Sequence, residues 1–434
     1  MKRLLPPALA LCLASTAAAE PGALDELRAE VQALRAELSA LRDPGWTHQA
    51  RAAEVHEAVE AAVEAAQSDA QRRGGHDGNE FFLEGPNHRL NLTGLLQFRH
   101  VALADDAGNA GEDPSGFELR RARLAFSGHV VEPELTFFLQ LDADRDGGDL
   151  FVLDALAQYE FDNGVQVKAG RMVLPFLYEQ LLSVKRQLAV DRSILTGFFN
   201  AGRSEMIRVD APLGDRLRVM AAFSDGGNRD RTGALVDATD WAFTSRLEAR
   251  LLGDAAEGAT STAVDTPATL LLGAAGHAQR NRGGAGAGGG SGGSGGSGGQ
   301  TLAAWTADAV FKSGRVAGTL TYAGASAGGF EAHGLGAQAG VSVTGSLQPF
   351  ARYDLLDDGE VDPVQALTAG LNWYLSGNAA KLTVDGLWVF EAPAGFGGTA
   401  PAGLTNAAFS SGLGLAPPDG EDQLAIRTQL QLVF

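Results

Sequence analysis

Hydrophobic and polar residues alternate along most of the chain after about residue 89, which is the pattern of strands with one apolar and one polar face. The last segment, 422–434, shows this most clearly. Its apolar positions are Leu424, Ile426, Leu430 and Leu432, with Arg427, Gln429 and Gln431 between them and Phe434 at the end. A tilted membrane strand needs about 9–11 residues, so this segment can separate lipid from water. We interpret it as the closing strand of an outer-membrane barrel and Phe434 as an assembly signal; an edge strand of a soluble sandwich is the alternative.

The same alternation predicts an all-β transmembrane barrel of about sixteen antiparallel strands. They are expected over residues 89–101, 117–129, 134–143, 150–161, 164–173, 204–211, 215–224, 241–252, 268–280, 301–311, 315–324, 331–343, 346–355, 363–375, 380–391 and 422–434. Their connections tend to alternate between short and long, as periplasmic turns and outer loops do. The 253–267 connection is long for a periplasmic turn, so the register is least defined there.

A helical period replaces this alternation near the N-terminus. Residues 20–43 carry a heptad pattern at Leu24, Leu27, Val31, Leu34, Leu38 and Leu41. Charged residues at the flanking heptad positions would pair Glu30 with Arg35 and Glu37 with Arg42 of neighbouring helices. The pattern predicts a short parallel coiled coil and a homotrimer, with a lone amphipathic helix packed on the barrel as the alternative. Residues 44–86 are expected to be a helical and Gly-rich periplasmic linker.

Residues 1–19 have the basic start, short apolar run and Ala-rich end of an export signal peptide. The only cysteine, Cys12, lies within it, so no disulfide or cysteine–metal site is expected in the mature chain. The scattered histidines form no metal motif, and no Ser, His and acid triplet suggests catalysis. The sequence therefore predicts a protein that is not an enzyme and needs no cofactor or metal.

The charged residues become informative when each is assigned to the lipid face or the lumen face of its strand. The net charge of −19 argues against a nucleic-acid partner. Assigning the apolar face to lipid leaves a basic lumen set of Arg99, Arg121, Arg123, Lys168, Arg208, Arg216, Arg218, Arg246, Arg250, Arg352, Lys381 and Arg427. The acidic set is smaller: Asp142, Asp154, Glu160, Asp210, Glu248, Asp308, Asp354 and Asp385. A cationic lumen favours anions, although these arginines could equally pair with carboxylates across the wall.

The connection 174–203 carries too many apolar residues for a free surface loop. We expect it to fold into the barrel and to bring Lys185, Arg186 and Arg192 to the channel; packing against a neighbouring subunit is the alternative.

Several segments resemble the phosphate-selective porin family of the O and P type. They are 116–124 (GFELRRARL), 135–142 (LTFFLQLD), 170–176 (GRMVLPF) with Glu179, and 189–193 (AVDRS). The resemblance implies a trimeric barrel of sixteen strands, a third loop folded into the channel, and basic residues that guide anions. The chain differs from that family in its acidity and in the few lysines of this loop.

Together these features predict an outer-membrane porin for passive diffusion of small hydrophilic solutes, with a preference for anions such as phosphate. The predicted anion path is Arg121, Arg123, Arg216, Arg218, Lys185, Arg186 and Arg192. The expected surroundings are a lipid bilayer, lipopolysaccharide and the barrel-assembly machinery, with the N-terminal segment in the periplasm. The alternative is a structural protein that tethers the membrane to the cell wall through its coiled coil.

Overall fold

The computed structural model describes residues 29–36, 56–61, 73–77, 80–105, 114–143, 148–228, 239–253, 266–281, 299–390, 392–398 and 400–434. Sixteen of its strands form the barrel: β3 (His88–Asp105), β4 (Ser115–Val130), β5 (Glu132–Ala143), β6 (Leu150–Glu160), β7 (Gln166–Val173), β8 (Arg203–Leu213), β9 (Leu217–Ser224), β10 (Thr239–Leu252), β11 (Thr266–Asn281), β12 (Thr301–Gly314), β13 (Val316–Ala327), β14 (Phe330–Val341), β15 (Leu347–Asp357), β16 (Val364–Ser376), β17 (Ala380–Phe390) and β18 (Gln423–Val433).

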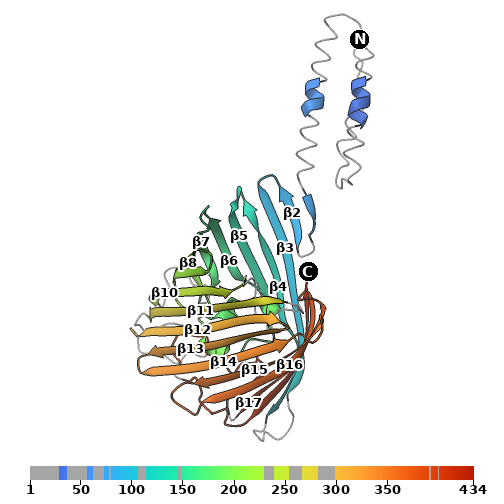
Figure 1. The fold of residues 1–434 in the computed structure, drawn as a ribbon. Helices are drawn as coiled ribbons and strands as arrows, with labels where there is room; N and C mark the ends of the chain where they lie inside the picture. The colour runs from blue at the N-terminus through green and yellow to red at the C-terminus, as the bar shows by residue number, and fades with distance from the viewer. Residues whose placement is uncertain are drawn as a thin grey trace, which may run out of the picture. The chain divides into compact units, whose positions relative to one another are not determined.

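Each barrel strand pairs antiparallel with its sequence neighbours, and β18 pairs with β3 to close the sheet (Figure 1). The closing register runs from Gln423 opposite Asp105 to Val433 opposite Leu95. Closure removes the unpaired edges that an open sheet of this length would expose. The predicted sixteen-stranded antiparallel barrel is thus confirmed, with strand ends shifted by a few residues.

The two faces of the barrel differ as the alternation requires. In β18, Leu424, Ile426, Leu430 and Leu432 are exposed on the outer face. The intervening Arg427, Gln429 and Gln431 are buried inside the barrel. An apolar outer band with a polar interior is the arrangement that lets strands cross lipid.

The N-terminal part of the chain contains two short strands that the sequence pattern does not predict. The chain divides into two compact units, residues 1–75 with 82–86 and residues 76–81 with 87–434. Residues 29–36 and 56–61 are helical, while β1 (Arg73–His76) and β2 (Phe81–Gly85) form two short paired strands inside the region predicted to be helical and Gly-rich. The signal segment and most of the predicted coiled coil lie outside the described residues. None of the described helices is both long and apolar enough to span a membrane.

The segment 174–202 lies inside the barrel and carries α4 (Tyr178–Leu181), the 3-10 turn η1 (Val184–Arg186) and α5 (Ile194–Phe199) (Figure 1). Ser193 caps α5, because its hydroxyl oxygen accepts a hydrogen bond from the Thr196 amide at 3.0 Å. The apolar residues of this segment form the main core of the protein with the inner face of β12–β17.

Small residues make room for this core. The inner face of β12, β13 and β14 presents Ala304, Ala323, Ala325, Ala332 and Gly334. A Cβ atom at Gly334 would approach the Phe199 ring to 2.7 Å and a Leu356 methyl to 2.9 Å. The segment 174–202 can therefore lie directly against the wall because the wall side chains have been reduced to methyl groups or hydrogen.

The chain end is seated on a glycine of the first barrel strand. The Phe434 amide donates to the Gly94 carbonyl at 3.1 Å, and the Gly94 amide donates back to the Phe434 carbonyl. A Cβ at Gly94 would lie 2.4 Å from the Phe434 ring. The terminal aromatic therefore packs on bare backbone at the seam where the barrel closes.

We predict that Gly94→Val and deletion of Phe434 have the same effect, because both remove this contact. Each should lower the amount of folded barrel in outer-membrane fractions severalfold, while channels that do insert keep their conductance. Gly116→Val is the matched control, since a Cβ there meets nothing within 4 Å. Folded barrel is measured as the heat-modifiable band on gels, and normal levels of both variants would refute an assembly role for the contact.

Candidate ion path through the barrel

The segment 174–202 is fixed by side chains that project from the inner wall to its backbone carbonyl groups. These hydrogen bonds include those from Arg246 to Phe176 (3.0 Å), Lys381 to Gln187 (2.8 Å), Asn372 to Leu188 (2.9 Å) and Arg352 to Asp191 (3.0 Å). Another contact runs the other way, from the Val190 amide to the Asp385 carboxylate at 2.9 Å. These bonds satisfy an irregular backbone that would otherwise be buried without partners.

A second connection, residues 392–421 between β17 and β18, covers the first. Its Ala407 amide donates to the Gly197 carbonyl at 2.7 Å, and its Phe396 ring packs on Phe198 with centroids 5.3 Å apart. The alternating pattern identifies the strands on either side of this connection and predicts nothing about its position. The sequence nevertheless contains a signal for its inward position. Like 174–203, the connection carries several apolar residues, and the structure buries Phe396, Leu404, Leu413 and Leu415.

These two segments divide the lumen into two unequal faces. The covered wall is the inner face of β10–β18 and β3, where Arg99, Arg246, Arg352 and Arg427 have side chains no more than 2% exposed. The open wall is the inner face of β4–β9. Its Arg121 side chain is 6% exposed, and six further basic side chains are 10–43% exposed: Arg120, Arg123, Lys168, Arg203, Arg208 and Arg218. Most of the basic side chains that water and ions reach therefore lie on the open wall.

Three arginines surround one carboxylate of the inner segment where the covered wall, at β3, meets the open wall, at β4. Asp191 lies 2.7 Å from Arg120, 2.9 Å from Arg121 and 3.6 Å from Arg99. Arg99 also pairs with Glu118. Three guanidinium groups around one carboxylate leave a net positive charge at the point where the inner segment meets the wall.

Arg120 reaches this group through a β-bulge. In the pairing of β3 with β4, Gln97 lies opposite Arg121 while Phe98 lies opposite Leu119, so Arg120 is the extra residue. A bulge lets two successive side chains point to the same side. Strict alternation places Arg120 on the lipid face, which is why the sequence analysis missed it; the run of arginines at 120, 121 and 123 was the only signal.

Two ion pairs and one further group of cations extend along the open wall. Arg123 binds Asp142 at 2.7 Å, and Arg203 forms a two-point pair with Asp154 at 2.9 and 3.0 Å. Asp210 is shared by three cations, Lys168 at 3.0 Å, Arg208 at 2.6 Å and Arg218 at 2.8 Å. This second three-to-one group also carries a net positive charge.

The predicted path residues occupy different places. Arg121 and Arg123 lie in the open wall as paired groups, and Arg218 is the most exposed member of the Asp210 group. Arg216 is exposed in the turn before β9, outside the wall. Lys185 and Arg186 are half-buried on η1.

Arg192 serves the inner segment itself. Its guanidinium donates to the carbonyl groups of Glu179, Gln180 and Leu182 at 3.2–3.5 Å. It therefore ties the two ends of the turn that carries η1. The structure does not bring the seven residues of the predicted anion path together in one row. The open wall also carries four basic residues outside that prediction: Arg120, Lys168, Arg203 and Arg208.

The surrounding charges and burial shift the pKa values of Asp191 and Arg192 in the inner segment. Burial by itself would raise the pKa of Asp191, but Arg120, Arg121 and Arg99 hold it well below its usual range. Burial lowers the pKa of Arg192 to about 10, with the positive charges of Arg203 and Arg123 adding to the effect and Asp191 opposing it. Both groups therefore stay charged at neutral pH.

Comparison with known proteins agrees with this geometry. The family model of phosphate-selective porin O and P matches residues 101–389, which is more than half of the chain. No curated protein sequence matches.

Solved structures share the fold at low sequence identity. The anion-selective porin from Comamonas acidovorans superposes with a TM-score of 0.55 at 16% identity, over 80% of this chain and 100% of that one. The outer-membrane channel DcaP of Acinetobacter baumannii gives 0.52 at 12%, over 80% and 98%. OmpF of Salmonella typhi, solved with daunomycin, gives 0.51 at 12%, over 80% and 98%.

A closed barrel of sixteen strands with an inner segment and one open, charged wall is a porin, a channel for small solutes in the outer membrane of Gram-negative bacteria. The chain belongs to the phosphate-selective porin O and P family.

We predict that Asp191→Asn destabilises the barrel by about 3–5 kcal/mol, the cost of breaking a buried charge pair from one side. Because the folded pKa of Asp191 is depressed, its contribution is fully present above the ordinary value of about 4 and is lost only as pH falls through the much lower folded value. The stability gap between wild type and variant in urea should therefore stay constant from pH 5 to 8. A gap that closes near pH 6 would contradict the assigned charge state.

Proposed function

We propose that this porin prefers anions, and that the open wall sets the preference. One observation carries the proposal: the carboxylates of this wall are more deeply buried than their basic partners. Side-chain exposure is 18% for Arg120 against 4% for Asp191, 20% for Arg203 against 9% for Asp154, and 43% for Arg218 against 2% for Asp210. Glu118, at 28% against 0% for Arg99, is the exception.

The depth of a charge matters because an ion in the channel can contact an exposed charge but cannot contact a buried one. An ion in the channel meets the guanidinium and ammonium groups directly, while the carboxylates lie behind them. Arginine offers a planar fork that suits phosphate or carboxylate oxygens, so anionic solutes are the class best matched. Diffusion is passive, with the wall lowering the barrier for anions and raising it for cations.

The net charge of −19 does not oppose this preference. Charges on outer loops lie largely beyond a Debye length of roughly 8–10 Å from the wall and are screened. Charges along the narrow path act at contact distance.

We predict that Arg120→Gln combined with Arg218→Gln moves the reversal potential in a KCl gradient toward cation preference. A charge roughly 8 Å from an ion contributes about 0.5 kcal/mol in water, with opposite sign for an anion and a cation. Each removed charge should therefore change the permeability of each ion about twofold and the anion-to-cation ratio about fivefold, with a larger change at low salt than at high salt. Both Asp191 and Asp210 keep two basic partners in this variant, so the fold is retained.

Arg216→Gln with Arg280→Gln is the matched control, since both residues are exposed at strand ends away from the open wall. It removes the same charge and should leave the reversal potential unchanged. Equal shifts in both variants would mean that total charge, not the wall, governs selectivity. A wild-type channel that prefers potassium would overturn the proposal.

We also propose that the porin is a homotrimer with its N-terminal segment in the periplasm, held in register by the heptad of residues 20–43. The helical residues 29–36 are consistent with that heptad, and Leu34 is exposed in the single chain. A tether to the cell wall is the second candidate, favoured by the same heptad. Deleting residues 20–85 separates the two functions, because a porin still conducts while a tether loses its effect on the envelope.

We predict that Leu34→Asp with Leu38→Asp weakens the trimer without unfolding the barrel, because charges at heptad core positions oppose helix packing. Light scattering in mild detergent gives the mass, and gel mobility before and after heating reports the barrel. A wild-type protein that is monomeric under these conditions would refute the trimer.

A further inference from the structure

The outer face of β7 and β8 carries a charged pair. Arg171 of β7 is opposite Glu205 of β8, and its guanidinium lies 3.0 Å from the Glu205 carboxylate. Met172 and Met206, the residues that follow them in the sequence, are buried in the core inside the barrel. Because side chains alternate along a strand, Arg171 and Glu205 point outward, on the face where Ile207 is 59% exposed.

This pair lies at the height where lipid tails would surround a bare barrel. Ala155 of β6 is opposite Arg171, and Tyr159 follows it by four residues toward the short turn after β6. Outward aromatic residues such as Tyr159 mark the edge of the apolar band, which is about 25 Å tall. Four residues span roughly 13 Å of a tilted strand, or roughly 10 Å in height. The pair is therefore well inside the band.

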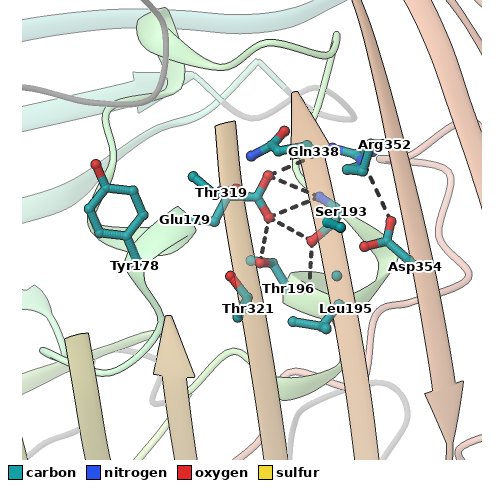
Figure 2. A pocket seen from close by; sticks show the side chains of 12 residues that line it. Tyr178, Glu179, Ser193, Leu195, Thr196, Thr319, Thr321, Gln338, Arg352 and Asp354 are labelled. Atoms are coloured by element: carbon teal, nitrogen blue, oxygen red, sulfur yellow. Dashed lines mark hydrogen bonds and ion pairs between the residues drawn. The ribbon is translucent and has the colours of Figure 1, made fainter. Parts of the chain in front are cut away.

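Inside the barrel, a charged group that is withdrawn from water has several partners. Glu179 of the inner segment accepts hydrogen bonds from the hydroxyl groups of Ser193 and Thr196, each at 2.6 Å, and lies 3.6 Å from the Arg352 guanidinium (Figure 2). Lipid tails offer no donors or acceptors, and a charge on the lipid face of a barrel is most costly at the middle of the bilayer. Bare lipid is therefore a poor surrounding for the outer pair.

The strands beside the pair are also short for a wall that faces lipid. β7 and β9 have eight residues each, whereas a strand needs about 9–11 to cross the bilayer core. The strands of the opposite side, β10–β17, have 11–16 residues. A second barrel in contact with β7–β9 would take the place of lipid along this low part of the wall. The small outward residues Ala155 and Ala169 let it approach closely.

A second polar spot lies on the outer face where the barrel closes. His100 of β3 is opposite Thr428, which is the sixth of the eleven residues of β18. Both point outward, because their sequence neighbours Arg99 and Arg427 are buried in the lumen. This spot therefore also lies near the middle of its strands. An imidazole and a hydroxyl group can donate to a carboxylate and accept from a guanidinium, so they complement the charged pair.

We propose that these two spots form the subunit interface: Arg171 and Glu205 of one protomer contact His100 and Thr428 of a second copy of this chain. A closed ring needs two different patches on each protomer, and here they lie on either side of β4 and β5. The inference rests on the trimer proposed above, whose heptad predicts parallel copies side by side. Parallel copies bring spots of similar height together.

Cross-linking tests the interface in the full-length porin with Cys12→Ser, which removes the only cysteine. Ile207→Cys and Phe98→Cys are one outward position from Glu205 and His100, on the side of the short turns, and leave both polar spots intact. With a short bismaleimide, the double variant should give covalent dimers and trimers, and each single variant should stay a monomer on denaturing gels.

Leu320→Cys with Leu367→Cys is the matched control for random collision. Both residues are exposed on the outer face of β13 and β16, at 50% and 39%, away from the proposed interface. This pair should give no covalent oligomer under the same conditions.

Arg171→Leu combined with Glu205→Leu tests the polar contact itself. It should lower the temperature at which the trimer separates by several degrees while the heat-modifiable band remains, and His333→Leu on the outer face of β14 should not. If the pair faced lipid, the two leucines would leave that temperature unchanged or raise it. The cross-linking variants keep the pair, so they decide the question even if the double leucine variant fails to fold.

The outcomes separate this interface from the trimer on which it rests. A trimeric mass by light scattering without cross-linking of the Ile207→Cys and Phe98→Cys variant would overturn the interface and leave the trimer. Equal cross-linking in the control pair, or an unchanged or higher separation temperature in the double leucine variant, would also overturn it. A monomeric mass would refute the trimer and the interface together.

Discussion

The docking of residues 174–202 on the inner wall is the contact on which the rest of the channel depends. It combines two kinds of complementarity. Alanine and glycine positions of β12–β14 admit the aromatic and aliphatic side chains of the segment, and buried Arg246, Arg352 and Lys381 bind its carbonyl groups. Burying three cations is costly unless each finds partners, and here the irregular backbone supplies them. The segment and the wall therefore satisfy each other, and neither would be stable in this form alone.

This docking also explains how an acidic protein can present a basic channel. Most lumen charges of β10–β18 are removed from the path by the segments that cover them, including the two-point pairs Arg246–Asp308 and Arg427–Asp385. What remains accessible is the open wall. There Asp191 and Asp210 each bind three basic side chains and lie behind them. The sign of the charge along the ion path thus depends on which charged side chains are exposed to it, and the net charge of −19 for the whole chain has little influence on it.

The sequence predicts the barrel well because its signal is local and repeated. Lipid on one side and water on the other require a two-residue period in every strand, and all sixteen strands followed from it. The apolar excess of 174–203 was likewise visible. Three features were not predictable in this way. Arg120 enters the lumen through a bulge, whose position depends on the pairing partner. Residues 392–421 cover α5 through contacts more than 190 residues apart in sequence. β1 and β2 lie in the Gly-rich end of residues 44–86, where the sequence pattern does not predict strands.

Arginines with the same sequence pattern have different surroundings in the structure, and the sequence alone does not distinguish them. Arg123 and Arg427 both project from strand positions into the lumen, and both pair with an aspartate on the neighbouring strand. Alternation and charge cannot distinguish them. The distinction comes from the covering segments: Arg427 also donates to the Leu413 carbonyl and is fully buried, while Arg123 keeps part of its surface free. Arg427 consequently fixes a loop, while Arg123 stays partly accessible from the lumen. A residue's role in this channel is therefore decided by what lies across the lumen from it, which is a property of the closed barrel and of no single strand.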